Sequence, residues 1–173
     1  MGLGVLIAKN AIDKTIIQGG TGNNSAELLQ GNQMPEDFES GTINVPAICG
    51  FSAGLDFVKK RSIRQIYNHE TALIDRLFKG LSKNDKVILY CNPQKGGYLP
   101  VLSFNVEGKN SAETAMYLNN YHVAVRAGLH CAPMAHKQIN TLDIGTVRVS
   151  VSVYNTMEEV EYLLRVIKNI KNL

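Results

Sequence analysis

A cysteine, a histidine and two arginines are the side chains of this sequence best suited to chemistry. Cys131 follows His130 in the stretch RAGLHCAPMAH, which begins with Arg126, and Arg148 lies in the later stretch TVRVSVSV. A guanidinium group binds a carboxylate through two parallel hydrogen bonds. Nearby positive charge favours the thiolate form of a cysteine, which is its nucleophilic form. These residue types predict a site that holds an amino-acid carboxylate and presents a thiolate to its side chain.

Two predicted strands determine where the arginines point. Valines alternate with Arg148 and two serines over residues 146–153, so Arg148 lies on the face opposite the valines. Arg126 alternates with valines in the same way over residues 123–128. If the two strands are neighbours, both guanidinium groups share one space. The loop that carries Cys131 runs between these strands in the sequence.

The same residues allow other interpretations. A lone cysteine is usually an inert part of a core, and an arginine on the outer face of a strand is usually solvated. A zinc site would combine four residues of this region: His122, His130, Cys131 and His136. Their gaps match no standard zinc pattern, so we predict no metal site. A cysteine hydrolase would need an orienting Asn or Asp and an oxyanion hole, and a sequence shows neither.

The remaining cysteines, one further histidine and a glycine-rich stretch have simpler interpretations. Cys49 and Cys91 lie in apolar stretches and are predicted to be structural, and His69 lies on a polar helix face and is predicted to be solvated. The glycine-rich stretch GGTGNN at Gly19–Asn24 lacks the Gly-Lys-Ser/Thr ending of a phosphate loop. We interpret it as a turn.

Composition limits the class of protein. The 173 residues correspond to one domain or one and a half, and 45% of them are hydrophobic. A net charge of +3, from 18 basic and 15 acidic residues, is too balanced to predict nucleic-acid binding. No apolar run approaches the ~20 residues of a membrane span, and no basic segment precedes the first apolar run as in a secretion signal. Three widely separated cysteines favour a reducing, cytoplasmic compartment.

Hydrophobic periodicity predicts the elements that must position the site. Strands are expected in six segments: 4–8, 15–20, 86–92, 100–108, 123–128 and 146–155. Helices are expected in four segments: 46–60, from Ser62 to near Gly80, 111–121 with Ser111 as cap, and from Thr156 onward, where Glu159 completes a capping box. A long polar loop is expected over residues 21–44. This order predicts an α/β fold in which helices pack on a mostly antiparallel sheet.

Three segments together resemble a known family. They are FESGTINVPAICGFSAGLDFV, RAGLHCAPMAHK and LDIGTVRVSVSVYNTMEEVEYLL. In this order they resemble the cysteine desulfurases of the class V aminotransferase superfamily, which use pyridoxal phosphate (PLP). The resemblance implies the C-terminal part of a PLP-dependent transferase fold. Residues 1–50 would be the remaining edge of the large PLP-binding domain, and residues 51–173 the small C-terminal domain.

The resemblance also implies an activity and its residues. In the parent enzymes sulfur moves from L-cysteine to a cysteine persulfide, L-alanine is released, and an acceptor protein takes the sulfur, as in iron–sulfur cluster assembly. Cys131 matches the nucleophile that becomes the persulfide. Arg148 matches the arginine that binds the substrate carboxylate. Arg126 matches the arginine at the start of the loop that carries the cysteine. The family is homodimeric, so we expect a homodimer.

The resemblance gives roles to three further residues, and the position of His130 beside Cys131 gives a role to a fourth. Thr42 matches a threonine that reaches the cofactor phosphate of the neighbouring subunit. Asn44 and Glu39 belong to the same block, Asn44 as a substrate-binding residue and Glu39 in support. We also assign His130 a supporting role, because its ring would add positive charge beside the thiol if it were protonated.

The cofactor lysine of the family has no counterpart in this sequence. The family position falls before residue 1, and none of the lysines present matches it, including Lys9, Lys14 and Lys137. We therefore expect that this chain alone neither binds PLP nor desulfurates cysteine. Another class V activity such as selenocysteine lyase remains an alternative. A non-catalytic sulfur-accepting or dimerisation module is a further one.

Overall fold

A computed structural model of the chain describes residues 2–10, 12, 14, 16–31, 33–93 and 99–170. The chain divides into two compact units, Met1–Lys60 and Arg61–Leu173. The second unit contains every described strand and carries Cys131 and both arginines. The predicted assignment of residues 1–50 to the edge of a large domain and of residues 51–173 to a small domain stays a prediction.

A four-stranded antiparallel sheet forms the centre of the second unit. Its strands are β1 (Val87–Leu89), β2 (Val101–Val106), β3 (Arg126–Gly128) and β4 (Thr146–Ser150). They lie in the order β1-β2-β4-β3, and each neighbouring pair is antiparallel. The predicted antiparallel sheet is confirmed, although every strand is shorter than its predicted segment.

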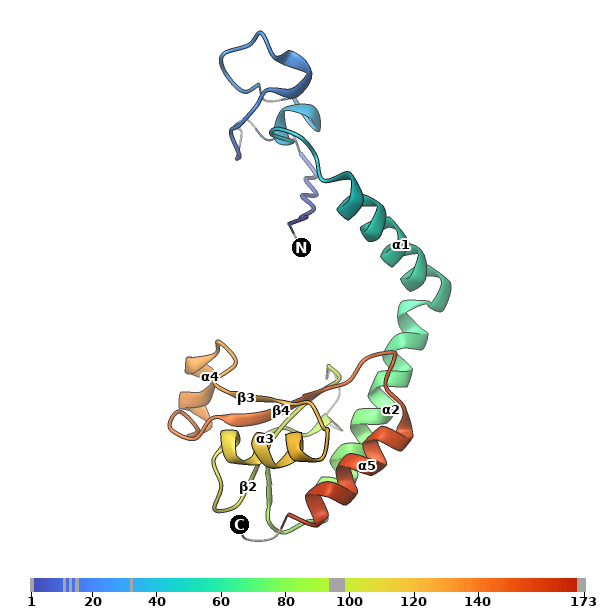
Figure 1. Cartoon of the computed structure of the whole chain (residues 1–173), viewed down its shortest axis with the longest axis vertical. Helices are drawn as coiled ribbons and strands as arrows, with labels where there is room; N and C mark the ends of the chain where they lie inside the picture. Colours follow the sequence, from blue (N-terminus) through green and yellow to red (C-terminus); the bar gives the residue numbers. More distant parts are fainter. Residues whose placement is uncertain are drawn as a thin grey trace. The chain divides into compact units, whose positions relative to one another are not determined.

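Four helices belong to the second unit: α2 (Ile63–Leu81), α3 (Ser111–Asn120), α4 (Pro133–Gln138) and α5 (Met157–Lys168). Figure 1 shows α2 and α5 side by side, with α3 across the sheet. Three of these helices were predicted. The short helix α4 was not, because six residues are too few for a helical period to show in the sequence.

One face of the sheet builds the hydrophobic core. Leu102 lies opposite Val149, and Phe104 lies opposite Val147, and all four side chains are buried. Buried residues of three helices cover this face: Leu73, Ile74 and Leu77 of α2, Tyr117 and Leu118 of α3, and Val160, Leu163, Val166 and Ile167 of α5. Since side chains alternate along a strand, Arg148 and its cross-strand neighbours point to the face away from these helices.

Capping residues mark where the helices begin. Thr156 accepts a hydrogen bond from the backbone N–H of Glu159, and the Glu159 carboxylate accepts one from the N–H of Thr156, which confirms the predicted capping box. Ser62 caps α2 through the N–H of Gln65. The predicted cap of α3 was wrong by one residue, because Asn110 forms the capping box instead of Ser111.

The first unit has one long helix and little other regular structure. Helix α1 (Val45–Arg61) was predicted, and two 3-10 turns, Gly22–Asn24 and Glu36–Phe38, lie within the predicted long loop. The strands predicted over 4–8 and 15–20 were wrong for the described residues of those segments, which form no strand. A strand needs a partner strand for its backbone hydrogen bonds, and the described residues offer these segments only isolated bonds, such as the one from the N–H of Gly41 to the carbonyl of Gly20 at 2.9 Å.

Much apolar surface of the first unit is exposed. No residue of α1 is buried, and the exposed large side chains include Val5, Ile7, Ile17 and Phe51. Some of them line a groove of 620 Å³. The first unit therefore lacks a core of its own within the described residues. No helix in the described ranges is long and apolar enough to span a lipid bilayer.

We predict that Thr156→Ala lowers the free energy of unfolding by about 1 kcal/mol, because the first turn of α5 loses its side-chain cap. Urea unfolding followed by circular dichroism measures the change. Thr156→Ser is the matched control, since it retains the hydroxyl. Equal losses in the two variants would contradict the capping explanation.

Candidate functional site

Two arginines lie directly opposite each other on neighbouring strands. Arg126 of β3 pairs with Arg148 of β4, and Ser103 of β2 pairs with Arg148 on its other side. The expectation that the two strands are neighbours is confirmed, and both arginines belong to the face of the sheet opposite α2, α3 and α5. Like charges directly opposite each other on neighbouring strands destabilise a sheet. A bound anion would remove that repulsion.

Arg148 is the more enclosed of the two arginines. It is partly buried, whereas Arg126 is exposed. Its Nε atom is buried and has no hydrogen-bond partner in the described part of the chain. A buried donor without a partner is costly. A carboxylate can accept hydrogen bonds from Nε and a terminal nitrogen of one guanidinium together, so a carboxylate ligand would satisfy this donor.

Cys131 sits at the tip of a tight turn that follows β3. Ala132 donates its backbone N–H to the carbonyl of Leu129 at 2.9 Å, which closes the turn. The two central residues, His130 and Cys131, have φ angles of 53° and 59°. Such left-handed backbone costs roughly 1–2 kcal/mol for a residue with a Cβ atom. The thiol is exposed, so the interpretation of Cys131 as an inert core residue was wrong.

The His130 ring is hydrogen-bonded to the sheet. Its Nε2 atom donates to the carbonyl of Thr146 at 3.1 Å. Burial lowers the pKa of His130, and the nearby charges of Arg148, His136 and Arg126 lower it further, against the opposing effect of the Thr146 hydrogen bond. The supporting role of His130 stays a prediction, and the lowered pKa disfavours the protonated ring on which that role depends. The positive charge of this site comes from the arginines.

Three predicted site residues lie in the first unit: Glu39, Thr42 and Asn44. All three are exposed. The side chain of Asn44 accepts a hydrogen bond from the N–H of Ala47 at 3.1 Å, so it caps the start of α1. Cys131 and both arginines lie in the second unit, and a shared site between the two groups stays a prediction.

The residues of the zinc alternative have other surroundings. His122 is exposed at the end of α3, whereas His136 is buried and bonds Thr141. Among the residues that the structure describes, no three His, Cys, Asp or Glu side chains gather as a metal site requires. The zinc alternative therefore has no support in the structure.

Three other predicted assignments have mixed outcomes. Cys91 packs partly buried against the core, as expected for a structural cysteine. Cys49 is exposed on α1, so its structural interpretation was wrong. His69 is exposed but not simply solvated, because its Nε2 atom donates to the carbonyl of Asn155 at 2.9 Å.

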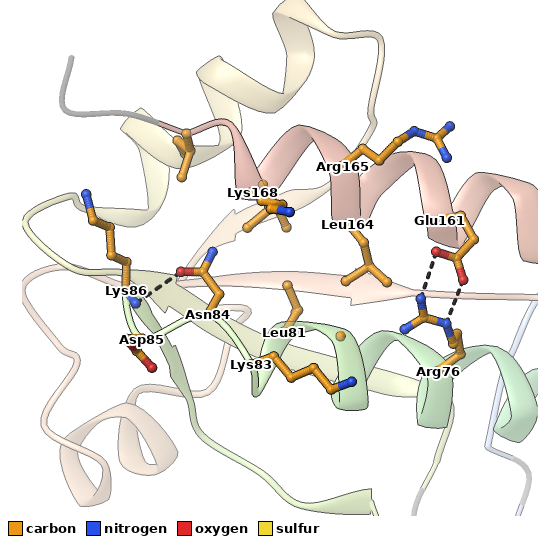
Figure 2. Close-up of a pocket in the computed structure, with 13 residues that line it drawn as sticks. Arg76, Leu81, Lys83, Asn84, Asp85, Lys86, Glu161, Leu164, Arg165 and Lys168 are labelled. Carbon is orange, nitrogen blue, oxygen red and sulfur yellow. Dashed lines mark hydrogen bonds and ion pairs between the residues drawn. The ribbon is translucent and has the colours of Figure 1, made fainter.

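A separate hollow of 760 Å³ lies beside the C-terminal ends of α2 and α5 (Figure 2). Its lining has five cationic and two acidic side chains: Arg76, Lys83, Lys86, Arg165 and Lys168, with Asp85 and Glu161. Arg76 donates from Nε and Nη2 to the two carboxylate oxygens of Glu161, at 2.6 and 2.8 Å. None of the predicted site residues lines this hollow, so it is distinct from the Cys131 site.

Comparison with known proteins assigns the family. The family model of class V aminotransferases matches residues 1–163. The chain belongs to this family. It is 33% identical to a cysteine desulfurase of Klebsiella pneumoniae over 180 aligned positions, which cover 99% of the chain and 43% of that relative. It is 35% identical to a probable cysteine desulfurase of Pyrococcus abyssi over 137 positions, which cover 79% of the chain and 33% of that relative.

Solved structures of class V relatives share the fold. The apo structure of a cysteine desulfurase from Thermococcus onnurineus matches with a TM-score of 0.73 at 32% identity, covering 95% of this chain and 38% of that chain. A cysteine desulfurase from Escherichia coli matches with a TM-score of 0.69 at 26% identity, covering 78% of this chain and 32% of that one. The resemblance to cysteine desulfurases is confirmed. This chain spans less than half the length of these relatives.

We predict that the folded chain loses stability as the pH falls below about 6.5, the ordinary pKa of histidine. Because the folded-state pKa of His130 is lowered, the unfolded chain binds more protons in this range, and the free energy of unfolding falls with pH. In His130→Gln, an amide that does not titrate replaces the ring and can still donate to Thr146.

Urea unfolding of both proteins at pH values on either side of that pKa measures the effect. The pH dependence contributed by the other titrating groups is common to both proteins, so the difference between them reports His130. Stability that falls equally in the two proteins would contradict the lowered pKa.

Proposed function

We propose that this class V chain is the C-terminal portion of a cysteine desulfurase and that Cys131 receives sulfur in that reaction. The observation that carries the proposal is the pair of arginines opposite each other on β3 and β4, at the base of the loop that presents the exposed Cys131. A carboxylate-binding pair beside a thiol matches an amino-acid substrate whose side chain reacts with sulfur. The family match supports the same assignment.

Each residue then has one physical task. Arg148 holds the carboxylate of L-cysteine through its partly buried guanidinium, and Arg126 adds charge from the neighbouring strand. The Cys131 thiolate attacks the substrate sulfur, so that a sulfur–sulfur bond forms while the carbon–sulfur bond breaks. The electron pair left on carbon is then protonated, which gives L-alanine. In the parent enzymes PLP supplies the electron sink for that pair.

The residues of this chain do not fit a complete PLP site. Lys9, Lys14 and Lys137 are all exposed, and the family resemblance assigns none of them to the cofactor bond. Thr42, assigned to the cofactor phosphate of the neighbouring subunit, is exposed in the first unit. We therefore propose that the chain alone is inactive as a desulfurase. Its own contribution is the carboxylate grip and the sulfur-accepting thiol.

Partners and setting follow from the proposed activity. The proposed partners are L-cysteine, an acceptor protein that takes sulfur from Cys131, and a second copy in a homodimer, within the cytoplasm. Iron–sulfur cluster assembly is the proposed use of the sulfur. The exposed apolar groove of the first unit favours a second candidate, a dimerisation or docking module without catalysis of its own.

We predict that Cys131 takes up sulfur from a small-molecule hydropersulfide such as glutathione persulfide. In this exchange the thiolate attacks the outer sulfur, and glutathione leaves as its thiolate. Mass spectrometry of peptides locates the added sulfur atom. We expect it at Cys131 faster than at Cys49, which is also exposed and serves as the internal comparison.

Cys131→Ser is the control for this exchange and should abolish the modification of that peptide. Sulfur uptake at Cys49 or Cys91 with none at Cys131 would remove the basis for the sulfur-accepting role.

We predict that added PLP forms no stoichiometric adduct with a single lysine of this chain, because none of its lysines matches the cofactor lysine that the resemblance implies. Borohydride reduction followed by peptide mapping measures this. With L-cysteine present as well, no alanine should accumulate. One fully labelled lysine together with alanine release would show that the chain is a desulfurase by itself.

A further inference from the structure

A buried histidine and a buried threonine lie behind the turn that carries Cys131. His136 of α4 is 4% exposed and Thr141 is 1% exposed. The Nδ1 atom of His136 and the hydroxyl of Thr141 are 2.7 Å apart, and the N–H of Thr141 donates to the carbonyl of His136 at 2.9 Å. These two hydrogen bonds join the end of α4 to the segment that leads back to the sheet.

The same pair reaches the turn through His130. The rings of His136 and His130 have centroids 5.8 Å apart and are tilted by 45°. His130 is itself bonded to Thr146 at the start of β4. Between Thr141 and the start of β4 there is a further hydrogen bond, in which the N–H of Gly145 donates to the carbonyl of Thr141 at 2.8 Å. The β3–β4 connection is therefore braced from within at several points.

The turn needs such a brace. His130 and Cys131 are consecutive residues in left-handed backbone, and neither is a glycine. Residues persist in that conformation only where their surroundings fix them. Because Cys131 is exposed, its own side chain contributes little to fixing it. The neighbouring His130 ring and its contacts are the nearest restraint.

We propose that His136, held by Thr141, is a positioning residue that keeps the Cys131 turn in place and orients the His130 ring against the start of β4. His136 touches neither substrate nor reacting sulfur in this role. It acts through His130, on which the charges of Arg126 of β3, Arg148 of β4 and His136 of α4 converge. The role of His136 in sulfur transfer rests on the proposed function. Its role in bracing the turn does not depend on that function.

Three variants of the full chain separate bracing from ordinary core packing. Thr141→Val removes the hydroxyl and nearly keeps the volume, and Thr141→Ser retains the hydroxyl. His136→Asn keeps a hydrogen-bonding atom near the position of Nδ1 but removes the ring next to His130. The matched control is Thr114→Val in α3, which removes the hydroxyl of another fully buried threonine, bonded to Asn110.

Two measurements report on the turn directly. Hydrogen–deuterium exchange of the amides at 129–132 measures its opening, and the NMR titration of the His130 ring measures its surroundings. We expect Thr141→Val and His136→Asn to raise the exchange rate there by about tenfold, the effect of losing one buried contact. The pKa of His130 should rise toward its ordinary value in both. Thr141→Ser should restore both readouts, and Thr114→Val should change neither.

Several outcomes would overturn the proposal. Unchanged exchange at the turn in Thr141→Val would do so, as would an equal effect of Thr114→Val. Loss of cooperative folding in both Thr141→Val and His136→Asn would also do so, because the pair would then belong to the core rather than to the turn. Sulfur uptake by Cys131 is measured separately. A braced turn with an unreactive thiol would reject the proposed function alone, and a reactive thiol on an unbraced turn would reject this inference alone.

Discussion

The pairing of β3 with β4 is the constraint on which the candidate site depends. It places Arg126 against Arg148 on the face of the sheet opposite α2, α3 and α5, while Val147 and Val149 complete the core on the other face. The hydrophobic face fixes the register, because a shift by one residue would bury the arginines and expose the valines. The core thus holds two like charges together, and their repulsion makes the site receptive to an anion.

The fold could be predicted where the sequence pattern was local and repeated. The alternation of residues along β4 predicted which face of the strand joins the core and which carries Arg148. The Thr156–Glu159 pattern predicted the start of α5. The order of helices and strands gave the antiparallel sheet. Each of these features follows from residues that are near one another in the sequence, so no knowledge of distant contacts was needed.

The candidate site could be predicted only in part, because its remaining features depend on distant contacts. The strands expected near the N-terminus failed because their apolar residues have no described partner strand. The lowered pKa of His130 could not be predicted, because it comes first from burial of the ring and then from the charges of Arg148, His136 and Arg126, which lie on other elements. The link between His136 and Thr141 crosses the end of α4 and has no sequence pattern of its own.

The backbone at Cys131 has a consequence for how this protein balances two demands. Glycine is the residue that adopts a left-handed φ at least cost, yet this position and the one before it hold a cysteine and a histidine. A glycine at position 131 would remove the conformational strain of the turn. The protein would then be more stable but would lack the thiol. The chain therefore retains a thiol at a position where the backbone conformation favours glycine. At this position local stability is lowered in exchange for a reactive side chain.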